Sequence, residues 1–143
     1  AGRLDTKAVV LVQTRYPDHP FLKKLKSGTY MPFAMDLLTE RKKQSQPPYA
    51  YQALLKSSST VIQKNINFLE AVLKDFELLG CEFYGPMPAS IFKVRGRYFH
   101  YVLLQANKRT VLHNALNQLE KRIDQLAKSS SVRWKVEIDP LNF

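Results

Sequence analysis

The feature that most constrains the fold is a pair of apolar stripes with helical spacing, each lying between segments with strand character. The first stripe is Ile62, Ile66, Leu69, Leu73 and Phe76, and the second is Leu112, Leu116 (or Ala115), Leu119, Ile123 and Leu126. Residues spaced three or four apart share one face of an α-helix, so each stripe predicts a helix with one buried face. Gly80 is suited to end the first helix, and Asn107 to cap the second.

Four segments with strand character surround the two stripes. They are YAYQALLK (49–56), CEFYGPMPA (81–89), GRYFHYVLLQ (96–105) and VRWKVEID (132–139). The last alternates cleanly, with apolar Val132, Trp134, Val136 and Ile138 on one face and Arg133, Lys135 and Glu137 on the other. The order βαββαβ predicts an α+β domain of the split, ferredoxin-like type, an antiparallel sheet with both helices on one face. The opposite face of such a sheet is open or covered by a neighbouring domain.

Residues 1–46 have a different pattern. The β-branched run AVVLVQT (8–14) predicts a strand buried on both faces, followed by a short helix within 17–30 and a second helix at 31–43. One strand and two helices are too little for a core, so this segment is predicted to be the end of a larger domain. Pro47 and Pro48 mark the boundary with a second domain, 47–143.

The charge balance predicts a polyanionic partner. Lysines and arginines number 22 against 12 acidic residues, which gives a net charge of +10. Nucleic acid is the usual partner of such a domain, and solubility alone is the alternative. A membrane surface is not favoured, because no helix combines a basic face with an aromatic one.

Cysteine usage and the termini bear on the compartment. Cys81 is the one cysteine, which excludes an intrachain disulfide and a cysteine-built zinc site and favours a buried strand residue. No secretory leader and no apolar span of about 20 residues is visible. A cytoplasmic setting is therefore expected.

The stretch KVRGRYFHYV (93–102) is the main candidate for binding. No acidic residue lies between Glu82 and Glu120, whereas Lys93, Arg95, Arg97, Lys108 and Arg109 do. Strand alternation places Tyr98, His100, Val102 and Leu104 toward the core, which leaves Arg97, Phe99 and Tyr101 on the open face. Aromatic rings stack on unpaired bases and cations hold phosphates, so this face suits single-stranded nucleic acid.

The surroundings of that strand add phosphate contacts. Gly96 lets the backbone come close to a ligand, so Lys93, Arg95 and Arg97 are predicted to contact phosphates, and Lys108 joins them as a candidate. The alternative for the two aromatic side chains is that they pack against residues 1–46.

A second anion site is predicted at Arg109 and His113. They lie four residues apart in the first turns of a helix, so they share a face near its positive end. A peptide carboxylate or a phosphate would suit this position, and a solvated helix end is the alternative.

No catalytic constellation is present. The sequence has no phosphate loop, HExxH or GxSxG motif, and His19, His100 and His113 fall in three different elements. Glu137 and Asp139 share a strand face but have no nucleophile or acid partner. The chain on its own is therefore predicted to catalyse nothing and to hold neither metal nor cofactor.

Several motifs together carry a family resemblance. VVLVQTRYPDHP, YMPFA…LLTERKK…PPY, YGPMPA, RGRYFHYVLLQ and VRWKVEIDP resemble, in order, the C-terminal end of the primosomal protein N′ (PriA) family of replication-restart helicases. The resemblance implies that residues 1–46 end the second RecA-like helicase lobe, with Arg3 matching an arginine of the last helicase motif. Residues 47–143 would be a ribosomal-protein-like βαββαβ domain that helps to bind DNA. ATP with magnesium, and zinc, would belong to the upstream part of the parent protein.

The resemblance also implies a role and partners. The parent would be an ATP-dependent 3′–5′ DNA helicase, nucleoid-associated in the cytoplasm, that recognises abandoned replication forks and initiates primosome assembly. Its partners would be single-stranded and forked DNA, other primosome proteins, and the acidic tail of single-stranded DNA-binding protein, with Arg109 and His113 as the tail site. Relatives carry glutamine where this chain has His113, and R-x-R-x-Q where it has Arg97, Phe99 and Tyr101, so this strand face is more aromatic.

Three alternatives remain at the level of the sequence. The first is a protein-docking module that binds the acidic tail, with DNA contact incidental. The second is a ribosome-type RNA-binding domain, which would leave the helicase-lobe segment without a purpose. The third is a small-ligand regulatory domain, for which the sequence shows no convergent polar pocket.

Overall fold

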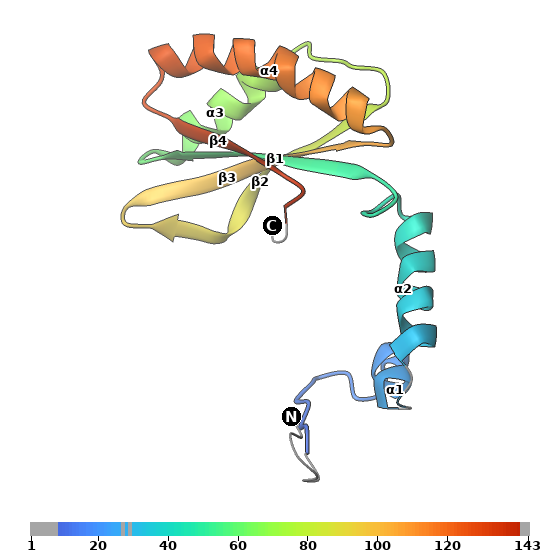
Figure 1. The fold of residues 1–143 in the computed structure, drawn as a ribbon. Coiled ribbons are helices and arrows are strands. Elements are labelled where there is room, and N and C mark those ends of the chain that lie inside the picture. The colour runs from blue at the N-terminus through green and yellow to red at the C-terminus, as the bar shows by residue number, and fades with distance from the viewer. Residues whose placement is uncertain (1–8, 27, 29, 141–143) are drawn as a thin grey trace, which may run out of the picture. The chain divides into compact units, whose positions relative to one another are not determined.

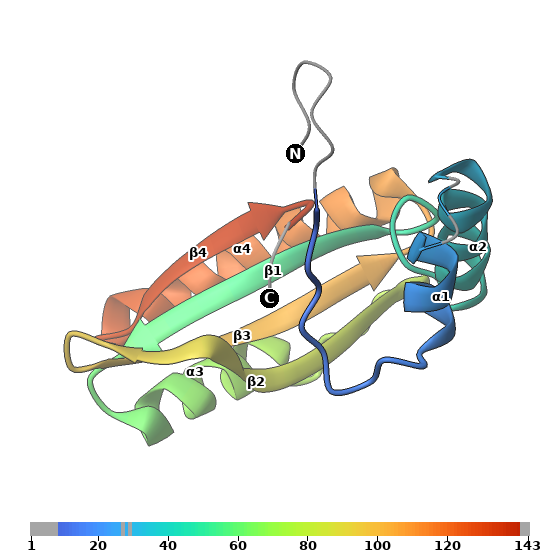
Figure 2. The same cartoon turned by 90° about the horizontal axis from the view of Figure 1, so that it is seen from below.

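The computed structural model describes residues 9–26, 28 and 30–140, and it divides into two compact units, 1–40 and 41–143. The second unit contains β1 (Tyr51–Ser59), α3 (Ile62–Leu73), β2 (Cys81–Val94), β3 (Arg97–Ala106), α4 (Arg109–Ser129) and β4 (Arg133–Ile138). The strand order is β2-β3-β1-β4 and every neighbouring pair is antiparallel. Both helices cover one face, and Figure 2 views the other (Figures 1 and 2). The predicted split α+β fold is confirmed.

The core lies between the sheet and the two helices. Its buried side chains are Ala53, Leu55, Cys81, Val102, Leu104 and Ala106 from the strands, Phe68, Leu69, Val72, Leu112, Ala115, Leu119 and Ile123 from the helices, and Val132 just before β4. On each central strand these core residues alternate along the chain, and β1 also buries Leu54 on the opposite face. The predicted inward face of α4 and the buried position of Cys81 are confirmed.

The buried face of α3 differs from the predicted stripe. Its buried residues are Asn65, Phe68, Leu69 and Val72, whereas Ile62 is exposed and the helix ends at Leu73. The physical reason is that β1 continues to Ser59, so that the end of the strand offers a backbone carbonyl to the Asn65 side chain. A search for apolar spacing cannot find a buried asparagine that is selected for hydrogen bonding.

The predicted end of β2 near residue 89 is wrong. The strand continues through Gly85, Pro86 and Pro88 to Val94, with register shifts between Tyr84 and Met87 and between Pro88 and Lys93. Because β2 is an edge strand, a proline without an N–H group interrupts pairing on one side at most. The predicted Asn107 cap is also wrong, since Lys108 occupies the N-cap position of α4 without a side-chain bond.

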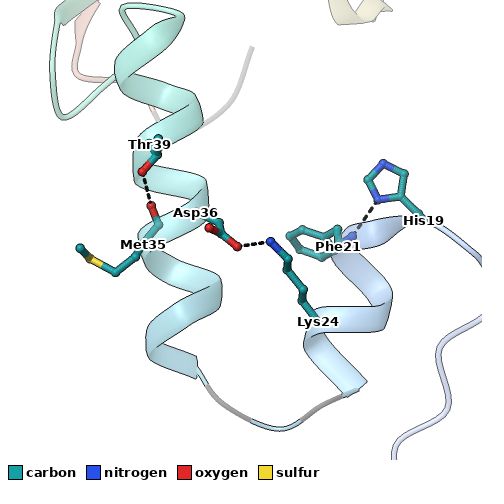
Figure 3. Close-up of polar contacts among 6 residues, drawn as sticks. All are labelled: His19, Phe21, Lys24, Met35, Asp36 and Thr39. Atoms are coloured by element: carbon teal, nitrogen blue, oxygen red, sulfur yellow. Dashed lines mark hydrogen bonds and ion pairs between the residues drawn. The ribbon is translucent and has the colours of Figure 1, made fainter.

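The first unit contains α1 (Pro20–Lys26) and most of α2 (Tyr30–Lys43), which confirms both predicted helices. Lys24 pairs with Asp36, Thr39 Oγ1 donates to the Met35 carbonyl at 2.8 Å, and the Phe21 N–H donates to His19 Nδ1 at 3.3 Å (Figure 3).

The strand predicted at 8–14 is wrong over its described part. Residues 9–14 form no strand, and Leu11 is 91% exposed. A β-branched run becomes a buried strand only beside partner strands, and the sheet of the described residues includes none of this segment. Arg3 lies outside the described residues, and the predicted domain boundary between 46 and 47 stays a prediction.

Candidate nucleic-acid interface

Strand alternation and pairing build the sheet face opposite the helices. Val102 and Leu104 pack under the helices, so the alternate residues of β3 occupy the other face. These are Arg97, Phe99 and Tyr101, as the sequence predicted, and all three are half-buried. We call this surface the open face.

The neighbouring strands bring cations that the sequence prediction missed. Lys56 of β1 lies opposite Tyr101 on one side and Lys135 on the other, because directly paired residues share a face. By the same rule Ser58 lies between Phe99 and Arg133. The alternation of 132–138 already placed Arg133 and Lys135 away from the core. Only the pairing with β1 shows that they join the aromatic row of β3.

Arg97 is fixed on this face by β1. Its Nη2 donates to the Ser58 carbonyl at 2.6 Å, and its Nε lies 3.3 Å from Ser58 Oγ. A guanidinium has more N–H donors than these bonds use, so it can still bind an anion. The side chain is therefore oriented before any ligand arrives, which lowers the entropy cost of binding.

One acidic residue, Glu137, partly neutralises the positive charge of the open face. Glu137 accepts a hydrogen bond from Lys56 Nζ at 2.7 Å and lies 3.6 Å from Lys135 Nζ. The hydrogen bond from Lys56 lowers the pKa of Glu137 below its ordinary range. Arg133 and Arg97 have no such ion pair among those formed by the described residues.

A groove continues the open face beyond Tyr101. It has a volume of about 1060 Å³. The sheet residues that line it are Tyr51, Gln52, Tyr84, Met87, Tyr101, Leu103 and Gln105. Gln52 Nε2 donates to Gln105 Oε1 at 2.6 Å, which leaves further amide donor and acceptor sites for a ligand. Aromatic rings beside amide groups are chemically suited to bases.

The β2–β3 hairpin carries three predicted phosphate contacts in three directions. Lys93 pairs with Tyr98 on the helix side, where its Nζ lies 4.9 Å from the ring centroid. Arg97 is on the open face, and Arg95 stands at the turn between them. Arg95 and Gly96 have φ values of 47° and 75°, which is typical of a two-residue type I′ turn.

Lys108, Arg109 and His113 lie at the other end of β3. About ten strand residues separate them from the hairpin, roughly 30 Å at the usual rise per residue. Arg109 Nε lies 3.4 Å from His113 Nε2, so the structure brings these two together as predicted. Lys108, by contrast, lies far from the hairpin, and its role as a phosphate contact stays a prediction.

The other residues considered as functional candidates, His100 and Cys81, are buried in the fold. His100 is buried and contacts the Asn65 amide, and burial lowers the pKa of its imidazole. Burial likewise raises the pKa of the Cys81 thiol. Among residues 9–26, 28 and 30–140, no three His, Cys, Asp or Glu side chains are grouped to hold a metal ion. In the same described part, no helix is long and apolar enough to cross a membrane.

Comparison with known protein families shows which family this chain belongs to. The family model of the primosomal protein N C-terminal domain matches residues 42–141, which include the whole split fold. The chain belongs to this family. The resemblance of the motifs to the primosomal protein N′ family is thereby confirmed.

Curated relatives of this family are similar over nearly the whole chain. The replication restart protein PriA of Haemophilus influenzae is 36% identical over 98% of this chain, and that of Buchnera aphidicola (Schizaphis graminum) is 32% identical over 91%. The Synechocystis protein of the same name is 30% identical over 99% of the chain. This chain spans 19% of the length of the first two relatives and 17% of the third. Among solved structures, the de novo designed protein Foldit4 is similar with a TM-score of 0.46 at 13% identity, covering 62% of this chain and 96% of its own.

Proposed function

We propose that this chain is the C-terminal DNA-binding domain of an ATP-dependent 3′–5′ helicase that recognises abandoned replication forks and initiates primosome assembly. Residues 1–46 would end its second RecA-like lobe. Support for a role in replication restart comes from the relatives named replication restart protein PriA. This chain matches about a fifth of the length of such a relative. The observation that carries the DNA-binding role is the row of Arg97, Phe99 and Tyr101 with Lys56, Arg133 and Lys135 beside it.

The open face would hold a single strand by two kinds of contact. Phe99 and Tyr101 offer rings for stacking, which contributes about 1–3 kcal/mol per base with little regard to sequence. Arg97, Arg133 and Lys135 would bind the phosphates on either side of the aromatic row. The groove past Tyr101 would accept the next base, with the amide groups of Gln52 and Gln105 at its edge.

A second candidate function is the docking of an acidic peptide tail. Arg109 and His113 lie together on the first turns of α4, and no acidic residue is present in its first turn. The positive end of the helix favours a carboxylate there. This site would serve single-stranded DNA-binding protein, whose acidic tail has that chemistry.

Fluorescence anisotropy of the 143-residue chain with single-stranded, duplex and forked oligonucleotides across a salt series tests the first function. The variant Arg133→Gln/Lys135→Gln should weaken single-strand binding and reduce the slope of log K against log salt by about 0.7 for each lost phosphate contact. Tyr101→Ala should weaken binding without changing the slope, because stacking releases no counterion. The matched control is Lys64→Gln/Lys121→Gln, two exposed lysines on the helices.

Two results would contradict the open-face assignment. One is an equal weakening of single-strand binding by the open-face variant and by the helix control. Net charge alone would then explain the effect. The other is unchanged affinity in Tyr101→Ala. Acidic-peptide binding that is lost in Arg109→Gln alone would support the docking function independently of DNA.

A further inference from the structure

The end of the β2–β3 hairpin exposes apolar side chains that the proposed function does not use. Ile91 is 70% exposed and Val94 is 42% exposed. We call residues 91–97 the hairpin tip. It also contains Lys93, Arg95 and Arg97, so apolar and cationic groups alternate over one short stretch.

The tip is anchored from the helix side of the sheet. The Phe92 ring lies 5.4 Å from the Tyr98 ring and 5.3 Å from the His100 ring, measured between centroids. His100 in turn contacts Asn65 of α3 at 2.9 Å. The irregular segment between Pro88 and Lys93 is thus fixed through Phe92, while Ile91 remains in solvent. An apolar group on such a fixed support is preorganised for contact with a partner.

The apex of the turn holds a cation in an unfavourable backbone conformation. Arg95 has φ 47°, a left-handed value at which type I′ turns prefer asparagine, aspartate or glycine. A residue kept in such a conformation against its preference is often found where function requires the side chain. The cation at the apex therefore points to an anionic partner.

The charge of the hairpin tip and the register of β2 against β3 indicate which kind of partner the tip fits. The sequence from Phe83 to Leu119 has no acid, so the hairpin tip contains no acidic residue, and Glu82 lies at the far end of β2. Val94 pairs directly with Arg97, which places it on the open face at the head of the row formed by Phe99 and Tyr101. Apolar side chains flanked by cations are the groups that proteins insert at base steps of a duplex.

We propose that the hairpin tip is a wedge for the junction between duplex and single-stranded DNA. Ile91 and Val94 contact the last base pair, Arg95 binds a flanking phosphate, and the freed strand continues over Phe99 and Tyr101. This inference rests on the proposed function and adds the junction itself as a ligand.

The test places 2-aminopurine in the last base pair of a forked oligonucleotide and measures its fluorescence with the 143-residue chain. The wild type should raise that fluorescence, because the base is unstacked. Ile91→Ser/Val94→Ser should abolish the rise and weaken fork binding about tenfold, while single-strand affinity changes less than about twofold. Val61→Ser/Leu79→Ser is the matched control, since these exposed apolar residues lie outside the tip, and circular dichroism checks folding of each variant.

The outcomes separate this inference from the function on which it rests. Fork binding and junction fluorescence unchanged in the tip variant would overturn the wedge and leave single-strand binding intact. Equal losses for single strand and fork would also overturn it, because the tip would then support the whole face. Unchanged fork binding with reduced binding to phosphatidylserine vesicles would assign the tip to a membrane surface instead. A wild type that binds no oligonucleotide would overturn the proposed function as well.

Discussion

At the residue scale, Asn65 connects α3 to the helix-covered face of the sheet. Its Nδ2 lies 3.0 Å from the Tyr98 carbonyl, 3.4 Å from the Ser57 carbonyl and 2.9 Å from His100 Nδ1. Carbonyl oxygens only accept, so Nδ2 is the donor, and His100 Nδ1 meets it as an acceptor in a neutral ring. A proton added at Nδ1 would face the N–H groups of Asn65. One buried amide thereby ties α3 to β1 and β3 and favours the His100 tautomer in which Nδ1 accepts.

This contact predicts a pH dependence of stability. Burial lowers the pKa of His100 below its ordinary value of 6.5, so protonation favours the unfolded chain. The free energy of unfolding should keep the full His100 contribution above pH 6.5 and lose it as the pH falls through the lowered pKa of the folded state. Urea unfolding at a series of pH values measures this.

The comparison variant is His100→Gln, which keeps an acceptor for Asn65 but cannot be protonated. In His100→Gln the loss of unfolding free energy at acid pH should disappear. His19→Gln, in the other unit, should behave as wild type. A His100→Gln profile parallel to that of the wild type would show that other groups cause the loss.

At the scale of elements, the β2–β3 hairpin depends on two glycines for different reasons. Gly96 has φ 75° at the turn, and a Cβ there would meet no atom within 4 Å. Gly85 has φ 122°, and a Cβ would lie 2.9 Å from the Tyr101 carbonyl oxygen and 3.0 Å from the Met87 nitrogen. The first position therefore has backbone strain alone, and the second has strain together with a clash against β3.

Alanine substitutions should separate these two costs. Gly96→Ala should lower the free energy of unfolding by about 1 kcal/mol, the usual cost of a left-handed conformation for alanine. Gly85→Ala should cost more, about 2–4 kcal/mol, because the edge strand must also move away from Tyr101. Equal losses in urea unfolding would mean that β2 moves freely at its irregular segment.

The same hairpin shows why local patterns misjudged the ends of elements. Pro86 and Pro88 predict a break, and in a central strand they would cause one. At a sheet edge the missing N–H groups cost little, so β2 continues to Val94. Whether a strand is central or at the edge depends on the other strands, which local composition does not describe.

At the scale of the whole molecule, the buried apolar residues of the described chain all lie in one unit, between Ala50 and Val132. Neither α1 nor α2 has a buried residue. The 41–143 unit therefore has its own core and should fold alone.

Deletion of residues 1–40 should leave the melting temperature of the remaining chain within about 2 °C of the intact chain, by circular dichroism. Single-strand affinity should also be unchanged. A clear rise in affinity after deletion would mean that the N-terminal residues cover Phe99 and Tyr101. A large fall in melting temperature would contradict the independence of the core.

The sequence by itself determined the order of elements, the two-layer architecture and the face on which Arg97, Phe99 and Tyr101 lie. These follow from periods of 2 and 3.6 residues, which are properties of the local backbone. Its motifs also identified the family, which the match to residues 42–141 confirms. The strand predicted at 8–14 does not form over residues 9–14, because a β-branched run becomes a buried strand only beside partner strands.

Only the tertiary structure decided which strands are neighbours, and this decided the make-up of the candidate site. The order β2-β3-β1-β4 places Lys56 and Arg133 beside the aromatic row and ties Arg97 to Ser58, 39 residues away in sequence. It also separates Lys108 from the hairpin by the length of β3. Strand adjacency comes from packing between distant segments, and no local period in the sequence encodes it.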